Sequence, residues 1–394
     1  MQLDRCSGDY YIRKMRIYLY IVTKRQIMKI AWIAPVKQKC GIAFYSKQYG
    51  QALESDVEIV ACDPMEFIVD KKGFGKKISQ CDCAHIQYET SLFTYNKSNF
   101  FKSMCKSIAI KKIITVHEIY ETPPYVFPRK DITGMWPVKK VKEYIWDLRH
   151  PHWVLYAKHE KAAFYSNRII VHAHFQKEIL NKRGVSLDCV VIIPHPIPSF
   201  RKLHKEKGPG NGTLVLGATG FINISYDYDL LIETLMNVPC PWKFVWVGGP
   251  RKPDDEKVLL MLQKKLITNN LQDKFIITGW VDDEKREDLL SEIMVYCALF
   301  TNRSASGSLS DAIGSGKMIV ATRIALTEEL HKNARILDVI DNSPVAIAQR
   351  IIAISTDAEL KKKQMANVQE YAQLTSYNAC AKKTIELYRN VISS

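Results

Sequence analysis

Short apolar runs alternate with helix-length segments along the whole chain, and this alternation constrains the fold more than any other feature. Continuous apolar runs of this kind are typical of parallel strands that helices cover on both faces, so the sequence predicts an α/β fold. The candidate strands are Lys29–Ala34, Val57–Ala61, Cys83–Gln87, Lys112–Val116, Arg168–Val171, Cys189–Ile193, Thr213–Gly217, Lys243–Gly248, Lys274–Thr278, Met294–Phe300, Met318–Ala321 and Ala334–Leu337.

The chain has 394 residues, which is more than one compact domain usually holds. Residues 200–212 are basic, contain Gly and Pro, and lack an apolar period, so they form the best linker. We therefore predict two Rossmann-like domains, 28–205 and 213–375, that face each other across a cleft. Residues 1–27 are expected to be a poorly ordered extension or a misplaced start. A last helix within 376–394 is expected to pack back toward the junction.

The net charge of +15 is concentrated in the first half. Residues 1–207 carry 35 Lys and Arg against 19 Asp and Glu, whereas residues 208–394 carry 21 against 22. A basic half could face an anionic membrane surface, a phosphate-bearing acceptor or nucleic acid, and solvated surface lysine is an equally good explanation. No nucleic-acid-binding motif is recognisable, so nucleic acid is not an expected partner. No apolar run reaches the ~20 residues of a membrane span.

The ten cysteines are scattered and form no CxxC pair. Several lie inside apolar runs, as reduced core thiols do, which favours a reducing, cytoplasmic compartment. We find no cluster of His, Cys or Asp at metal-ligand spacing, and therefore expect no metal and no cofactor.

Residues 291–322 contain the most informative local pattern. An apolar strand runs into the Ser/Gly-rich turn Arg303–Ser308, and a short helix with Asp311 follows. Backbone N–H groups and the positive end of a helix favour an anion such as a diphosphate there. Asp311, one turn into the helix, could bind a ribose hydroxyl. An ordinary Gly-rich connection between strand and helix is the alternative, because short motifs of this kind are weak on their own.

Nine segments in order resemble the retaining family 4 glycosyltransferases, which have the two-domain GT-B architecture. Besides 291–322 they are IAWIAPVKQKCGIAFYSKQYGQAL, CDCAHIQYE, IITVHEIY, VHAHFQKEIL, VVIIPHPIP, LVLGATGFINISYDYDLLIETL, WKFVWVGGPR and FIITGWVDDEK. The resemblance implies transfer of a hexose from a nucleotide-diphosphate sugar to a glycan or lipid-linked acceptor. It also implies retained anomeric configuration, no metal, and an acceptor-binding first domain. A peripheral place at the inner face of a membrane is an expectation that goes with it.

The resemblance also suggests residue roles, because parallel strands bring the loops at their carboxyl ends to one edge. His117 and Asp311 are the expected catalytic residues. On the donor side we expect Gly41, Gly249, Arg251, Arg303, Ser304, Ser306, Gly307 and Ser308. On the acceptor side we expect Lys39, His85, Glu89 and Glu118, whereas His172, His174 and His195 are expected to be structural.

The chain departs from the family pattern where chemistry is expected. Arg303 falls at the place of the first of two family Glu residues, and Asp311 takes the second. Asn223 and Tyr226 stand where an Arg and a Lys usually meet the donor diphosphate. Arg251, Arg303 and Lys317 could replace that pair of cations. The alternative is a non-catalytic GT-B protein, a sugar-binding or partner subunit, with a degenerate donor site.

Overall fold

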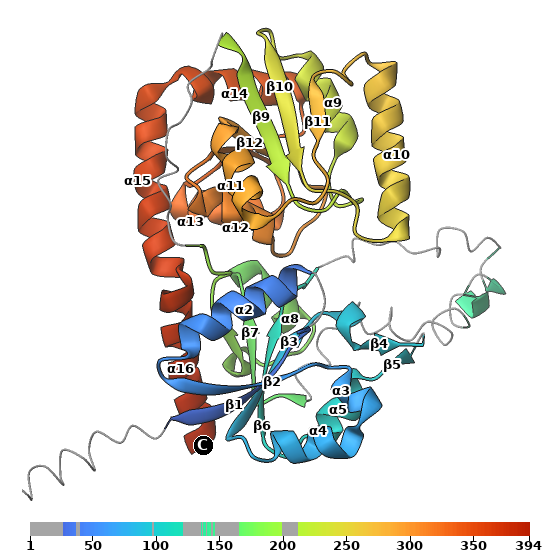
Figure 1. Cartoon of the computed structure of the whole chain (residues 1–394), viewed down its shortest axis with the longest axis vertical. Coiled ribbons are helices and arrows are strands. Elements are labelled where there is room, and N and C mark those ends of the chain that lie inside the picture. The colour runs from blue at the N-terminus through green and yellow to red at the C-terminus, as the bar shows by residue number, and fades with distance from the viewer. Residues whose placement is uncertain are drawn as a thin grey trace, which may run out of the picture.

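A computed structural model describes residues 27–36, 40–96, 98–120, 135, 137–138, 140–142, 145, 165–198 and 212–394. These residues form two α/β domains, one above the other in Figure 1, each built on a six-stranded sheet. Several predictions lie outside the described residues. They concern the extension 1–27, of which only residue 27 is described, and the linker 200–212, of which only residue 212 is described. They also concern Lys39.

The N-terminal domain has an all-parallel sheet in the order β2-β1-β3-β6-β7-β8. A two-stranded hairpin of β4 and β5, which the apolar pattern did not predict, lies beside it. The strands are β1 (Met28–Ile33), β2 (Val57–Cys62), β3 (Cys83–Tyr88), β4 (Thr94–Tyr95), β5 (Ser98–Asn99), β6 (Lys111–Val116), β7 (Arg168–Val171) and β8 (Val190–Ile192).

The C-terminal domain repeats the architecture, with an all-parallel sheet in the order β11-β10-β9-β12-β13-β14. Its strands are β9 (Leu214–Thr219), β10 (Trp242–Val247), β11 (Phe275–Ile277), β12 (Val295–Ala298), β13 (Met318–Thr322) and β14 (Asp338–Ile340).

Eleven of the twelve predicted strands are confirmed, and the twelfth, predicted at Ala334–Leu337, is wrong in position. Ala334 ends a helix, and Arg335 adopts a left-handed backbone with φ 50° that terminates it. Glycine normally takes this conformation at a helix end, so an arginine there hides the boundary from sequence reasoning. The strand begins instead at Asp338.

Helices cover both faces of each sheet (Figure 1). In the N-terminal domain they are α2 (Gly41–Leu53), α3 (Glu66–Val69), α4 (Lys71–Ile78), α5 (Phe101–Ser107) and α8 (His174–Lys182). In the C-terminal domain they are α9 (Tyr228–Met236), α10 (Pro253–Thr268), α11 (Asp283–Glu292), α12 (Gly307–Gly314), α13 (Ala325–Ala334), α14 (Pro344–Thr356) and α15 (Ala358–Thr375).

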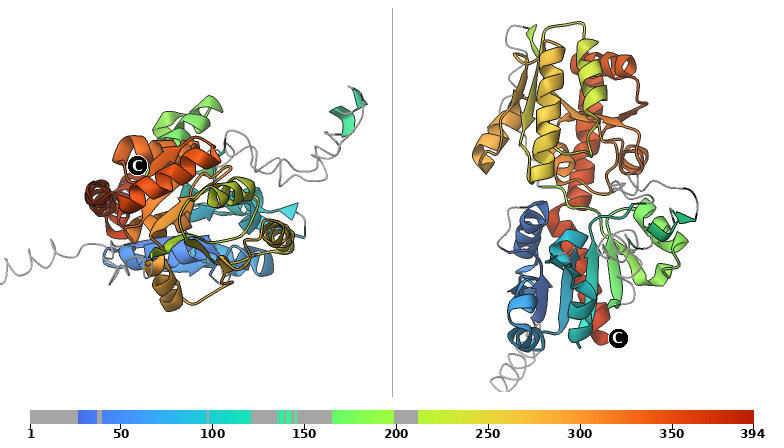
Figure 2. Two further views of the ribbon diagram at one scale, coloured as in Figure 1. Left: turned by 90° about the horizontal axis from the view of Figure 1, so that it is seen from above. Right: turned by 90° about the vertical axis from the view of Figure 1, so that its right-hand side faces the viewer.

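The last helix, α16 (Tyr377–Ser393), returns to the N-terminal domain. Ser376 breaks the path between α15 and α16 and caps α16 by accepting from Ala379 N–H at 3.2 Å. Tyr388 on α16 is fully buried and packs with Trp32 of β1 in one hydrophobic cluster. Figure 2 shows α16 against the lower domain and α15 beside the upper one. The two helices therefore tie the domains together along one side.

The N-terminal sheet buries a hydrophobic cluster on each face. Alternate residues of β1 point to opposite faces, so Ile30 and Trp32 join the α16 side whereas Ala31 and Ile33 join the other. The C-terminal domain has its own continuous core. Among the described helices, none combines the length and the apolar character that a bilayer span requires.

Candidate functional site

The carboxyl ends of the two sheets face each other, and the turn after β12 contacts the N-terminal domain. Ser304 in this turn has no exposed surface. Its Oγ accepts hydrogen bonds from Ile119 N–H at 2.7 Å and from Gln176 Nε2 at 2.7 Å. Gln176 Nε2 also lies 3.0 Å from Ser304 O. The Ser304 hydroxyl, predicted on the donor side, is thus enclosed between the domains in this structure.

A second contact joins α13 of the C-terminal domain to the start of α8. The carboxylate of Glu329 accepts from the backbone N–H groups of His174, at 2.9 Å, and Phe175, at 3.0 Å. The first N–H groups of a helix have no partner within the helix and carry its positive end, so a carboxylate stabilises them. Glu329 thereby supplies one domain with a helix cap from the other.

Three histidines and Tyr45 pack together below this contact. The ring centroid of Tyr45 lies 4.8 Å from that of His117, 6.0 Å from that of His172 and 5.5 Å from that of His195. Burial lowers the pKa of His172 to about 4 and that of His195 to about 3, and it lowers the pKa of His117 well below its usual value. The cluster is therefore neutral at pH 7.

His117 has an acceptor beside each of its ring nitrogens. Nδ1 lies 3.2 Å from His172 Nε2, and Nε2 lies 2.9 Å from Gln87 Oε1. His172 Nδ1 must donate to the carbonyl of Ile193 at 3.0 Å, so in the neutral ring its Nε2 can only accept. A neutral His117 carries one ring N–H and can donate to only one of these two acceptors. Its ring is buried, whereas the sequence predicted it at the cleft as a sugar ligand.

His195 extends the hydrogen-bond network to the C-terminal domain. Its Nδ1 lies 3.0 Å from Ser310 Oγ on α12. The sequence predicted a structural role for His195 but not that its partner belongs to the second domain. The neutral histidine cluster is therefore part of the domain interface.

The predicted phosphate turn forms the start of α12. Ser306 caps the helix, because its Oγ accepts from Leu309 N–H at 3.2 Å and lies 3.1 Å from Ser308 Oγ. A Cβ at Gly307 would meet no atom within 4 Å, so the first residue of the helix borders open space. The positive end of α12 and its first N–H groups are thus accessible to an anion.

Asp311 lies one turn into α12 and is held by a cation that the sequence analysis missed. Arg286 on α11 places Nη1 3.4 Å from Asp311 Oδ2, and their side chains are 27% and 20% exposed. The guanidinium of Arg286 also lies 5.5 Å from the ring centroid of Phe44 on α2. Arg286 therefore contacts the predicted ribose ligand and the N-terminal domain at once.

The loops after β9, β10 and β11 meet at the same edge of the sheet. A Cβ at Gly248 would fall 2.2 Å from Gly220 O, so only glycine permits this approach. Arg251 lies over the ring of Phe221 at 5.4 Å, and that ring lies 5.0 Å from the exposed ring of Trp280. Arg251 and the neighbouring Gly249 thus lie at the edge where the donor was predicted.

The positions that lack the family's diphosphate cations have structural partners. The Tyr226 side chain is buried, and its hydroxyl donates to Cys297 O at 2.7 Å. Asn223 Oδ1 accepts from Ser225 N–H at 2.9 Å. Of the suggested replacements, Arg303 lies over Phe300 at 5.6 Å. Lys317 is buried and donates to Ser291 O at 3.3 Å, just before β13 begins, so it is remote from the carboxyl edge.

Gly41, predicted on the donor side, is the first residue of α2, and a Cβ there would meet no atom within 4 Å. The acceptor-side residues within the described part of the chain lie in two kinds of place. Glu89 and Glu118 follow β3 and β6 and are half-buried. The ring of His85 is buried inside the N-terminal domain between Tyr388 Oη, at 2.6 Å, and Thr115 Oγ1, at 2.7 Å.

Within the described ranges, no three or more Asp, Glu, His or Cys side chains gather in a way that could hold a metal ion. The nine cysteines in the same ranges are all free thiols.

Most of the C-terminal domain matches a known family. Residues 214–357 match the family described as glycosyl transferases group 1. The matched region runs from β9 to the end of α14 and includes the turn 303–308, Asp311 and Arg286. A search of curated protein sequences finds no match.

Comparison with solved structures defines the fold as GT-B. A structure of Anabaena Alr3699/HepE with UDP and glucose is similar at 12% identity and a TM-score of 0.67, covering 92% of this chain and 99% of that one. Sucrose-phosphate synthase from Thermosynechococcus elongatus is similar at 14% identity and 0.68, covering 93% and 99%. A glycosyltransferase from Rickettsia africae is similar at 14% and 0.65, covering 94% and 100%.

Two functional candidates emerged only from the structure. Arg286 lies in the charged segment VDDEKRED, where the local sequence offers no reason to single it out. Glu329 is one of two adjacent glutamates, and only Glu329 contacts the other domain, whereas Glu328 pairs with Arg323 on the surface. Contacts between domains leave no periodic signal, which explains both omissions.

Proposed function

We propose that this protein is a glycosyltransferase that moves a hexose from a nucleotide-diphosphate sugar to an acceptor hydroxyl. The group 1 glycosyl transferase match over 214–357 carries the proposal. The open start of α12, with Asp311 one turn further on, gives that match a physical basis. Uridine nucleotides are the first donors to test, because the compared Anabaena structure contains UDP and glucose.

The reaction breaks the bond between the anomeric carbon and the diphosphate oxygen, so negative charge grows on the leaving diphosphate. Fixed dipoles aimed at such a charge lower the barrier. In this proposal the first N–H groups of α12, at Gly307 and Ser308, bind that diphosphate and Asp311 binds the ribose. Arg251 and Arg303 would add positive charge from neighbouring loops.

We propose retention of the anomeric configuration, as the resemblance to family 4 implies. The nucleotide would occupy the C-terminal domain, with Gly41 of the N-terminal domain approaching the donor, and the acceptor would bind the N-terminal domain near Glu89 and Glu118. No metal belongs to this proposal, so a chelator should leave turnover unchanged. The anomeric proton coupling of the product, measured by NMR, tests the stereochemistry, and inversion would contradict this part.

We propose that the acceptor is a glycan or a lipid-linked molecule. We also propose that the protein is cytoplasmic and binds peripherally at the inner face of a membrane. The excess of basic residues in 1–207 supports it, because polybasic surfaces bind anionic lipid. On α4, for example, Lys71, Lys72 and Lys76 are exposed beside the exposed Val69. Sedimentation with anionic vesicles tests it, and equal binding to neutral vesicles would contradict an electrostatic attachment.

A non-catalytic role is the second candidate, and one observation favours it. Tyr226 is buried and Asn223 is uncharged, so the loop after β9 contributes no cation to a diphosphate. The two functions differ in one measurement: an enzyme releases nucleoside diphosphate from its donor with turnover, whereas a binding protein only retains the donor.

A further inference from the structure

Arg286 contacts two other elements beside the proposed donor site. It belongs to α11, pairs with Asp311 of α12 at 3.4 Å, and rests over Phe44 of α2 at 5.5 Å. Gly41, three residues before Phe44, begins α2. The guanidinium therefore lies between the helix whose start we propose to bind diphosphate and the helix that follows the glycine loop.

The hydrogen bonding of Arg286 is incomplete. Nη2 lies 3.3 Å from Asp283 Oδ1 and Nη1 lies 3.4 Å from Asp311 Oδ2, which are both long for charge-assisted bonds. Its Nε is buried and has no hydrogen-bond partner within the described part of the chain. A guanidinium has five N–H donors, so this one retains capacity for an anionic partner.

The charge of the site points the same way. The loop after β9, which contains Asn223 and the buried Tyr226, carries no cation, and Lys317 lies just before β13, remote from the carboxyl edge. A diphosphate at this edge therefore needs a cation from another element. Arg286 is already held beside α12 by Asp311.

We propose that Arg286 is a donor-binding residue: its guanidinium supplies positive charge to the diphosphate, which the loop after β9 lacks, and it also holds Asp311 for the ribose. This inference rests on the proposed function. Because its guanidinium rests on Phe44, the charge is fully in place only while the domains are together. Donor binding and domain closure are thereby coupled through one side chain.

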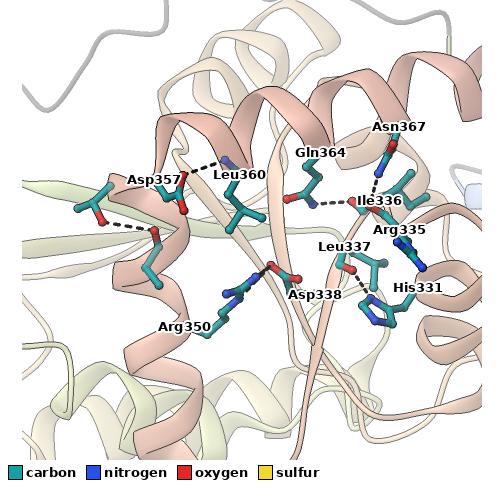
Figure 3. A network of polar contacts seen from close by, with 12 residues as sticks. His331, Arg335, Ile336, Leu337, Asp338, Arg350, Asp357, Leu360, Gln364 and Asn367 are labelled. Carbon is teal, nitrogen blue, oxygen red and sulfur yellow. Dashed lines mark hydrogen bonds and ion pairs between the residues drawn. The ribbon is translucent and has the colours of Figure 1, made fainter.

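The test compares Arg286→Gln with a matched control. Arg350 of α14 forms a similar Arg–Asp pair with Asp338, at 3.0 Å and with side chains 31% and 18% exposed. Figure 3 shows this pair at the start of β14, among contacts that pack α15. Arg350→Gln thus removes an equally buried ion pair away from the proposed donor site.

Dissociation constants for UDP, GDP and ADP are measured at low and high salt for the parent and the variants. We expect Arg286→Gln to weaken binding of the preferred nucleotide by roughly tenfold or more and to flatten its salt dependence. Arg286→Lys should keep much of the salt dependence, and Arg350→Gln should match the parent.

Two results would overturn the inference alone. Arg286→Gln could bind as the parent does, or it could lose affinity while the salt dependence stays unchanged, which would mean that the residue acts only through the local structure. If the parent protein binds none of the three nucleotides, the proposed function itself fails and the inference fails with it.

Discussion

One carboxylate oxygen of Glu329, in the C-terminal domain, contacts two nitrogen atoms of His174, in the N-terminal domain. Oε1 accepts from the backbone N–H of His174 at 2.9 Å and lies 3.0 Å from its ring Nδ1. The second carboxylate oxygen accepts from Phe175 N–H at 3.0 Å. The start of α8 therefore has its cap only while the two domains stay together, so this pair reports on domain closure.

Replacing Glu329 with Gln should loosen the domains. The variant loses the negative charge at the helix start, and we expect a cost of about 1–2 kcal/mol. Small-angle scattering of the free protein should then show a larger radius of gyration. Glu328→Gln, one residue earlier on the same helix but paired only with Arg323 at the surface, is the control. Identical scattering from both variants would contradict the assignment.

Ser304→Ala should destabilise the protein although it removes one atom. Ile119 N–H would lose its acceptor in a buried place, at a cost of about 1–3 kcal/mol, and Gln176 Nε2 would keep only the carbonyl of residue 304. Denaturant unfolding measures this loss. Ser355→Ala is the control, because Ser355 Oγ donates only to Ile352 O within its own helix. A Ser304 variant as stable as the control would mean that the interface is open in solution.

The buried histidines should make stability depend on pH. The folded-state pKa is about 4 for His172 and about 3 for His195, below the ordinary value of 6.5. The unfolded chain then binds more protons, so stability is complete above pH 6.5 and is lost as pH falls toward 4. At pH 5, keeping each ring neutral in the folded protein lowers the free energy of unfolding by about 2 kcal/mol. Melting temperatures should fall accordingly, and His195→Asn should make the decline shallower; a flat parent profile would contradict this.

Gly307→Ala should separate folding from donor binding. A Cβ there meets no atom within 4 Å, and alanine favours a helix, so the variant should fold with unchanged or slightly higher stability, by up to about 1 kcal/mol. The same methyl group would project into the space proposed for diphosphate and should weaken nucleotide binding. Gly75→Ala on α4 is equally unobstructed and lies outside the site. Equal nucleotide affinity in both variants would argue against the start of α12.

The two sheets could be predicted from sequence because the signal for a buried parallel strand is local. Runs such as Met318–Ala321 are apolar throughout and need no partner to be recognised. The displaced strand shows the limit: Arg335 ends a helix in a conformation that residue type does not announce. The order of apolar runs along the chain was enough to predict the fold, but it did not predict every helix and strand boundary.

The site could be predicted only in part. The turn before α12 and Asp311 lie at the expected edge, since a strand end and a helix start follow from the apolar pattern. The apolar pattern does not predict the direction in which each side chain points. His85 and His117 follow or lie in strands as expected, but their rings turn into buried hydrogen-bond networks. Arg286 was missed because its partners, Asp311 and Phe44, lie 25 and 242 positions away.

Turnover of nucleotide sugars tests the central claim most directly. The parent protein and Asp311→Ala are incubated with hexose conjugates of UDP, GDP and ADP, with and without extracted glycans and glycolipids, and release of nucleoside diphosphate is followed. We predict release from one nucleotide family, raised by an acceptor and lost in Asp311→Ala. The absence of any donor-dependent release, with every nucleotide and every acceptor fraction, would contradict the account of this protein as a glycosyltransferase.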